Sequence, residues 1–238
     1  MVLRDRHSEK VVTIFGPPGT GKTTRLLNIV EEELNNGTAV DKIGYFSFTK
    51  KAAHEAITRA MLKFRLDKKD FTYFRTLHSL AYHHLNLNPV DVMSDLNYRE
   101  VSDWLQIKIN NPNKSINELG ISTPKDVYLT LIDQSKIQGV SLQNQFARSG
   151  MHIDGGFDRL NYIDRGIRQY KDKHKLFDYT DMILEFIKMD NAPRLDVVIV
   201  DEAQDLSLIQ WLMVEQLIRK ADRAYIAGDD DQAIFNWA

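Results

Sequence analysis

The sequence predicts an α/β protein whose parallel sheet is interrupted by a mainly helical insertion. Near both ends of the chain, short apolar runs alternate with helix-like segments. The middle has scattered turn signals and no convincing buried strand. A glycine-rich loop also joins the first apolar run to the first helix-like segment. Parallel sheets bind ligands at the carboxyl ends of their strands, so we expect the functional site there.

Composition sets broad limits. The chain has 238 residues, of which 43% are hydrophobic and 27% charged, enough for one large or two modest domains with a core. The lack of cysteine excludes disulfides and thiolate metal sites, and is compatible with a reducing cytoplasm. No apolar run approaches the roughly 20 residues of a membrane helix, and the N-terminus is too charged for a signal peptide. A net charge of -2 argues against a uniformly basic nucleic-acid coat but permits a local basic groove.

The first third of the chain alternates strands and helices. Strands are predicted over residues 11–15, 43–48 and 71–74. A helix over 24–33 closes at the turn 35–37. Thr49 is the expected N-cap of a second helix, whose apolar positions are helically spaced as far as Phe64. Thr76 is the expected cap of a third helix over 77–85.

From about residue 88 to 175 the segments 95–109 and 125–138 look helical. The charged run 171–175 is interpreted as a solvated helix face. Alternation resumes with a strand over 197–200, a helix over 207–219 and a strand over 223–227. We therefore predict a sheet domain formed by 1–88 and 177–238, with a helical insertion domain over 89–176.

The segment from Gly16 to Thr23 matches the phosphate-loop pattern G-x-x-x-x-G-K-T in full. Backbone N–H groups and the helix dipole would face the phosphates, Lys22 would reach the outer ones, and the Thr23 hydroxyl would bind Mg²⁺. The alternative is a chance glycine-rich turn, which the strand and helix on either side disfavour. The predicted ATP-binding residues are Gly16, Pro17, Pro18, Gly19, Thr20, Gly21, Lys22, Thr23, Thr24 and Arg25.

Acidic residues follow the later strands. Asp201, after the apolar run, is placed to hold Mg²⁺, and Glu202 to polarise the attacking water. An acidic turn after a core strand is the alternative, which the phosphate loop makes less attractive. The last strand leads into residues 228–232, where Gln232 suits a sensor of the γ-phosphate. Because neighbouring side chains diverge on an extended turn, Asp229 and Asp230 are interpreted as a solvated acidic loop.

Together these segments resemble the motifs of the UvrD/Rep/PcrA-type superfamily-one DNA helicases. Residues 201–205 (DEAQD) and 228–237 (GDDDQAIFNW) resemble motifs II and III. Residues 48–53 and 76–81 resemble motifs Ia and Ib, and 177–182 resembles the aromatic-acidic segment before motif II. The resemblance implies a RecA-like P-loop NTPase domain, 1A, interrupted by a helical domain, 1B. It implies the N-terminal half of an ATP-dependent DNA helicase that uses ATP and Mg²⁺ on single-stranded DNA.

The resemblance also implies individual roles. Lys22, Glu202 and Gln232 would serve catalysis, and Thr23 and Asp201 the metal. The implied DNA contacts are Thr49, Lys50, Thr76, His78, Phe235 and Trp237. Stacking of a base on an aromatic side chain contributes roughly 1–3 kcal/mol and tolerates any sequence. The alternatives are a buried core position for Trp237, an ordinary helix start for Lys50 and a structural helix histidine for His78.

The chain departs from the family pattern at both ends. None of the residues before Gly16 is glutamine, whereas the family usually reads adenine with an upstream glutamine, so Arg25 is a candidate to stack on the base. The sequence stops at Ala238, inside motif III. We therefore expect the second RecA-like half, with its arginines, to be a missing partner from the same protein. Such arginines contribute about 10³–10⁵ in rate, so this chain should bind nucleotide, hydrolyse it feebly and not unwind DNA.

Two other function classes remain open. One is a nucleotide-dependent DNA-binding module that unwinds nothing. The other is a hexameric ring ATPase, which should carry a helical lid after its core, and residues 232–237 do not suggest one. The family resemblance suggests 3′-to-5′ movement and a role in replication or repair.

Overall fold

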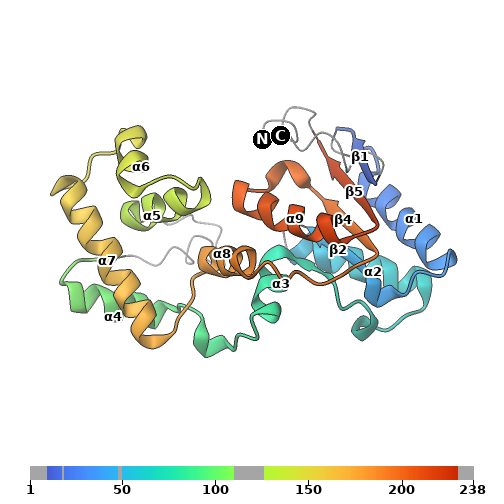
Figure 1. Cartoon of the computed structure of the whole chain (residues 1–238), viewed down its shortest axis with the longest axis horizontal. Helices are drawn as coiled ribbons and strands as arrows, with labels where there is room; N and C mark the ends of the chain where they lie inside the picture. Colours follow the sequence, from blue (N-terminus) through green and yellow to red (C-terminus); the bar gives the residue numbers. More distant parts are fainter. Residues whose placement is uncertain (1–9, 18, 48–49, 110–125, 230–238) are drawn as a thin grey trace. The chain divides into compact units, whose positions relative to one another are not determined.

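The computed structural model describes residues 10–17, 19–47, 50–109 and 126–229. The chain divides into two compact units (Figure 1). Unit 1 comprises Met1–Leu85 and Ile183–Ala238, and unit 2 comprises Asn86–Met182. The chain thus leaves unit 1 after its first three strands and returns for the last two.

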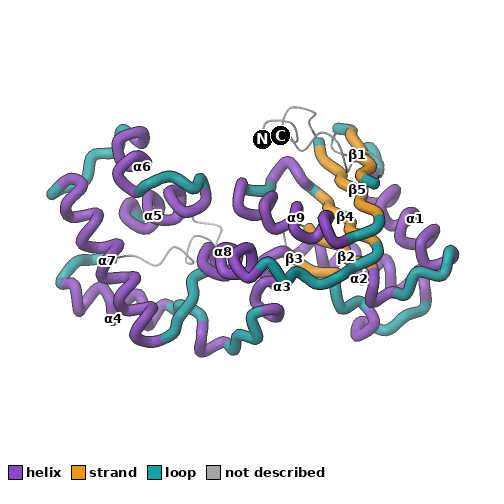
Figure 2. Tube along the Cα trace, viewed as in Figure 1, coloured by secondary structure: helices purple, strands orange, loops and turns teal. Residues whose placement is uncertain are grey.

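Unit 1 contains a five-stranded, fully parallel sheet with the order β1-β5-β4-β2-β3 (Figure 2). This confirms the predicted α/β class. The strands are β1 (Val11–Phe15), β2 (Ile43–Ser47), β3 (Phe74–Thr76), β4 (Val197–Asp201) and β5 (Arg223–Gly228).

One predicted strand was misplaced. The third strand was predicted over 71–74 and lies at Phe74–Thr76. Phe71 instead closes a short 3-10 helix, Lys68–Asp70, in which the side chains of Asp67 and Asp70 form a capping box. Phe71 is buried, although it packs into the core from a turn and not from a strand. An apolar residue at such a position has the same sequence pattern as a buried strand residue, which explains the misplaced prediction. The capping hydrogen bonds of Asp67 and Asp70 stabilise the 3-10 helix in place of an earlier start of the strand.

Helices cover both faces of the sheet. In unit 1 they are α1 (Lys22–Asn35), α2 (Lys50–Phe64), α3 (Leu77–His84) and α9 (Leu208–Lys220). Figure 1 shows α9 on one side of β4 and β5, with α1 on the other. Residues of α1 and α2 share one core cluster with Val197 and Ile199 of β4. Since successive strand residues face opposite sides, Val198 and Val200 face away from this cluster, and all of β4 is buried.

Several predicted boundaries differ from the structure for identifiable reasons. Helix α1 begins at Lys22, two residues before the predicted start, because Gly21 takes the left-handed conformation and serves as N-cap. The predicted cap of α3 is confirmed, since the Thr76 hydroxyl accepts the Ser79 N–H at 3.2 Å. The predicted cap Thr49 lies outside the described residues.

Unit 2 is helical in its described residues 86–109 and 126–182. Its helices are α4 (Asp95–Leu105), α5 (Val127–Ile137), α6 (Leu142–Ser149), α7 (Gly156–His174) and the start of α8 (Tyr179–Met189). The described part has no strand, only an isolated bridge between Val92 and Phe177, as the turn signals predicted. Helix α4 ends at Leu105 and not at 109, because Gln106 adopts a left-handed conformation. No described helix is both long and apolar enough to span a membrane.

Candidate active site

The carboxyl ends of the strands meet at one edge of the sheet in unit 1. Phe15 of β1 pairs with Gly228 of β5, and Ser47 of β2 pairs with both Asp201 of β4 and Thr76 of β3. The glycine-rich loop, the acidic pair and the start of the 228–232 segment therefore follow strands that end in register. Parallel topology turns motifs far apart in sequence into neighbours.

The loop between β1 and α1 needs its glycines for backbone conformation. Gly19 and Gly21 have φ angles of 81° and 87°, a region that side chains with a Cβ rarely adopt. Thr20 bends the loop back, since its N–H and hydroxyl both donate to the Pro17 carbonyl, at 3.3 and 2.8 Å. The first N–H groups of α1 are thereby aimed at the loop, which suits an anion.

Lys22 is buried at the base of this loop, with only 8% of its surface exposed. Its ammonium group donates to the carbonyls of Gly16 and Pro17, at 2.6 and 3.2 Å, and to the Asp229 carboxylate. An ammonium group has three donors, so these partners satisfy it. Asp229, interpreted as part of a solvated loop, has a side chain that is 27% exposed and is also held by the buried lysine charge, a partner that was not predicted. Asp230 lies outside the described residues.

Thr23 and Asp201 lie side by side, with the Thr23 hydroxyl donating to Asp201 Oδ2 at 3.0 Å. Hydroxyl and carboxylate oxygens are the ligand type that Mg²⁺ prefers. No cluster of three or more acidic, His or Cys ligands occurs among the described residues. Magnesium in nucleotide sites usually takes one or two carboxylates and completes its shell with phosphate and water, so this pair fits that ion.

A second hydroxyl also reaches Asp201. Tyr45, within β2, donates from its phenol to Asp201 Oδ2 at 2.6 Å. Burial, followed by the charge of Asp201, holds the pKa of Tyr45 well above its usual value, so the phenol remains a donor. Sequence reasoning missed this residue, because a tyrosine within an apolar strand carries no signal beyond strand propensity.

Glu202 is held in an unusual backbone conformation, with φ at 55°. Its carboxylate accepts a hydrogen bond of 2.8 Å from the Gln204 side-chain amide. The oxygen of the same Gln204 side-chain amide in turn accepts a hydrogen bond of 3.1 Å from the backbone N–H of Asp229. Gln204 therefore connects the acidic pair to the segment that holds Lys22. It was not predicted as a site residue, although its place in the DEAQD motif was a usable signal.

The remaining predicted residues are distributed as follows. Thr24 and Arg25 are exposed on α1, and Arg25 pairs with Glu32 at 3.0 Å. Thr76 is buried at its capping position, His78 is half-buried in the first turn of α3, and the backbone of Lys50 begins α2. Predicted residues outside the described part of the chain are Pro18, Thr49, Gln232, Phe235 and Trp237.

Unit 2 contains a separate cluster of buried charges. Lys136 of α5 contacts Asp178 and Asp181 at 2.9 Å each, and Lys171 of α7 contacts Asp178 at 2.6 Å and also Asp181. The interpretation of 171–175 as a solvated face was therefore wrong for Lys171, which is 6% exposed. Burial opposes the charge of Asp178, but the two lysines outweigh it and lower its pKa.

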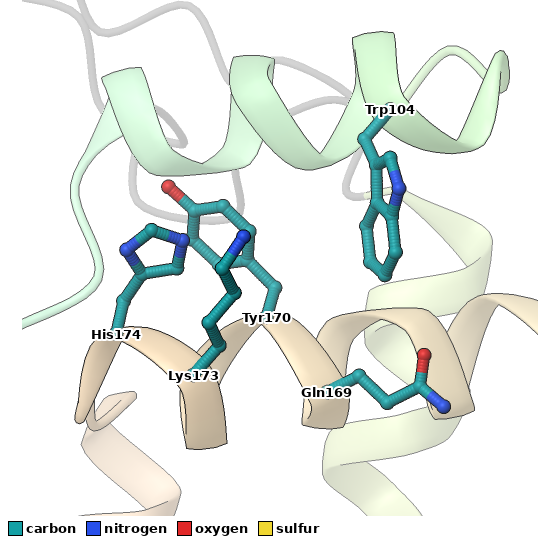
Figure 3. Close-up of a pocket in the computed structure, with 5 residues that line it drawn as sticks. All are labelled: Trp104, Gln169, Tyr170, Lys173 and His174. Carbon is teal, nitrogen blue, oxygen red and sulfur yellow. The ribbon is translucent and has the colours of Figure 1, made fainter.

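A shallow groove of about 310 Å³ also lies in unit 2 (Figure 3). Trp104 projects from α4, and Gln169, Tyr170, Lys173 and His174 project from α7. Among the described residues, none of those predicted for the nucleotide or DNA site lines this groove.

The comparisons with known proteins agree with the motif resemblance. A family model described as the UvrD/REP helicase N-terminal domain matches residues 4–238. The chain is 26% identical, over 96% of its length, to ATP-dependent DNA helicase srs2 of Schizosaccharomyces pombe, of which it covers 28%. It is 25% identical, over 95%, to a probable DNA helicase of Mycoplasma pneumoniae, covering 45% of that protein.

DNA helicase II of Haemophilus influenzae is 26% identical over 99% of the chain, which covers 34% of it. The chain thus spans less than half the length of each of these relatives. The family model matches almost the whole sequence and confirms the resemblance drawn from the motifs. This protein belongs to the UvrD/REP helicase N-terminal domain family.

Proposed function

We propose that this chain is the N-terminal ATP-binding half of an ATP-dependent DNA helicase that moves along single-stranded DNA in the 3′-to-5′ direction. The observation that carries the proposal is the meeting of Lys22, Thr23 and Asp201 at one edge of the sheet. Relatives named as DNA helicases support the choice of DNA as the substrate.

In the proposed nucleotide complex, Lys22 exchanges its bond with Asp229 for oxygens of the phosphates. Thr23 and Asp201 hold Mg²⁺, which supplies charge neutralisation at the phosphates when bound. Glu202 orients and polarises the attacking water, and its bond to the Gln204 amide fixes the carboxylate for that task. The other residues predicted from the phosphate loop line the ATP.

The proposed DNA contacts rest on the family motifs. Thr49, Lys50, Thr76 and His78 contact the DNA backbone, while Phe235 and Trp237 stack on bases. Gln232 senses the γ-phosphate and lies within five residues of both aromatics in the sequence. Loss of the γ-phosphate on hydrolysis would therefore be coupled to release of the stacked bases. The greater length of the relatives supports a second RecA-like half as the partner that closes on the nucleotide. In this proposal unit 1 is domain 1A and unit 2 is domain 1B.

Fluorescence anisotropy with a labelled oligothymidylate tests the DNA half of the proposal. Trp237→Ala should weaken DNA binding by about 1–3 kcal/mol, the contribution of one stacked base, and leave nucleotide binding intact. Lys22→Ala should do the reverse. Trp104→Ala is the matched control, because Trp104 is an exposed tryptophan of unit 2 that is not among the predicted contacts.

Equal losses from Trp237→Ala and Trp104→Ala would argue against stacking on Trp237. An RNA oligomer bound as tightly as DNA would remove the preference for DNA. Binding of DNA that changes with nucleotide, without any unwinding when the remainder of the natural protein is present, would favour the nucleotide-dependent binding module.

A further inference from the structure

The Tyr45 side chain is fixed inside the sheet. It is fully buried, and its ring stacks on that of Phe74 in β3, with centroids 5.4 Å apart and planes 18° from parallel. Its phenol reaches the neighbouring strand β4 and donates to Asp201 Oδ2 at 2.6 Å. A hydroxyl held by a stacked ring in a packed core has little freedom to move. The position of the Asp201 carboxylate is therefore tied to the sheet itself.

The hydrogen bonds of Asp201 leave little choice of orientation. Its Oδ2 accepts from both Thr23 and Tyr45, and its Oδ1 accepts the N–H of Glu202 at 3.0 Å. An ionised carboxylate has about four acceptor sites on its two oxygens. The described residues fill three, which leaves one, on Oδ1. Rotation of the carboxylate would break these bonds, so the remaining acceptor site has a fixed direction.

We propose that Tyr45 is a positioning residue for the metal–nucleotide complex, because it sets the direction in which Asp201 presents its remaining acceptor site. This inference rests on the proposed ATP site and adds a residue that neither the motifs nor the family match assigns to it. Mutation of a residue that hydrogen-bonds to a metal ligand and orients it commonly lowers metal affinity about 10–100-fold. Tyr45 does not touch the phosphates. Its effect should therefore appear in the dependence on Mg²⁺ and not in nucleotide affinity without the metal.

The test compares Tyr45→Phe with Tyr225→Phe. The control removes a hydroxyl from β5 that also donates to a carboxylate, that of Glu33, at 3.2 Å. Each variant is titrated with Mg²⁺ in the presence of a fluorescent ATP analogue, and the analogue is also titrated in excess chelator. We expect Tyr45→Phe to raise the half-saturating Mg²⁺ concentration about tenfold. The affinity of Tyr45→Phe for the analogue in excess chelator should match that of the unaltered protein. Tyr225→Phe should match the unaltered protein in both its half-saturating Mg²⁺ concentration and its affinity for the analogue in chelator.

An unchanged Mg²⁺ dependence in folded Tyr45→Phe would overturn the inference. Equal weakening with and without Mg²⁺ would also overturn it, because that pattern marks a general structural role. If Tyr45→Phe fails to fold, Phe74→Leu decides, since it loosens the ring but keeps the phenol and should shift the Mg²⁺ dependence in the same direction. Failure of the unaltered protein to bind the analogue at all would instead remove the proposed ATP site, a result distinct from failure of the Tyr45 role.

Discussion

The two units each bring lysines and aspartates together, but they use these charges differently. In unit 1, Lys22, Asp201 and Asp229 lie where the strands end, and Lys22 is bonded partly to loop carbonyls. In unit 2, Lys136 and Lys171 are each paired with both Asp178 and Asp181. The first cluster faces a glycine loop suited to an anion, and the second is enclosed by helices α5, α7 and α8.

In the proposed function, similar charged residues serve recognition in unit 1 and architecture in unit 2. A group intended for a ligand must have bonds that it can exchange, as Lys22 has with Asp229. A structural pair in a poorly hydrated interior instead depends on every partner, because an unpaired buried charge is costly. Changes in the unit 2 cluster should therefore alter stability, whereas changes in the strand-end cluster should alter ligand binding.

The largest expected effect on stability comes from Lys171→Met. Removing one partner of a buried ion pair costs about 3–5 kcal/mol, and we expect the lower end because Lys136 remains. The matched control is Lys173→Met, an exposed position on the same helix, which should change stability by less than about 0.5 kcal/mol. Urea unfolding followed by tryptophan fluorescence gives both values. Equal stabilities of the two variants would show that the cluster is not structural.

Asp133, beside this cluster, should make stability depend on pH. Burial, with repulsion from Asp178 as the next cause, raises the pKa of its carboxyl from 3.8 to about 6. The folded protein thus holds this proton more tightly than the unfolded chain. The resulting cost of ionisation is absent at low pH, grows between about pH 4 and 6, and is complete above pH 6.

Asp133→Asn should therefore stabilise the protein above pH 6, by about 1–2 kcal/mol after allowance for partial exposure. The gain should shrink as the pH falls towards 4.5. Urea unfolding at a series of pH values provides the measurement. A variant that is less stable than the unaltered protein at pH 8 would mean that the cluster needs the Asp133 charge.

Variants of Thr76 separate its structural role as the cap of α3 from its proposed contact with DNA. Its hydroxyl caps α3, so Thr76→Ala should lower stability by about 1 kcal/mol, and Thr76→Ser should largely restore it. Oligothymidylate binding by the folded alanine variant, which lacks the hydroxyl, compared with the serine variant, which keeps it, then reports any DNA contact of that hydroxyl. Loss of stability in the serine variant as large as in the alanine variant would mean that packing of the methyl group, and not the cap, is what matters.

The smallest expected effect belongs to Arg25, exposed on α1 and paired with Glu32. If its guanidinium stacks on adenine, Arg25→Ala should weaken ATP binding by about 0.5–1 kcal/mol and leave binding of inorganic triphosphate unchanged. Competition against a fluorescent nucleotide measures both ligands. Equal weakening of both ligands would assign Arg25 to the phosphates, and no weakening of either would leave it a surface residue.

Sequence patterns predicted the sheet class, the helical insertion and the strand-end position of Lys22, Thr23 and Asp201. These features could be predicted because they depend on hydrophobic periodicity and on a loop in which the local backbone conformation requires glycine. The patterns misplaced β3, misread Lys171 and did not predict the ion pair of Asp229 with Lys22, because the burial and pairing of a charge depend on residues far away in the chain. Tyr45 was missed for the same reason: its partner Asp201 is 156 positions further along.

The central claim is that the strand-end cluster binds a nucleotide, and calorimetric titration of Lys22→Ala with Mg²⁺ and a slowly hydrolysed ATP analogue tests it most directly. Loss of charge-assisted bonds to phosphate should weaken binding at least about 100-fold relative to the unaltered protein. Lys63→Ala, which removes an exposed lysine paired with Glu31 in the same unit, should bind normally. Wild-type affinity in a folded Lys22→Ala protein would contradict the account.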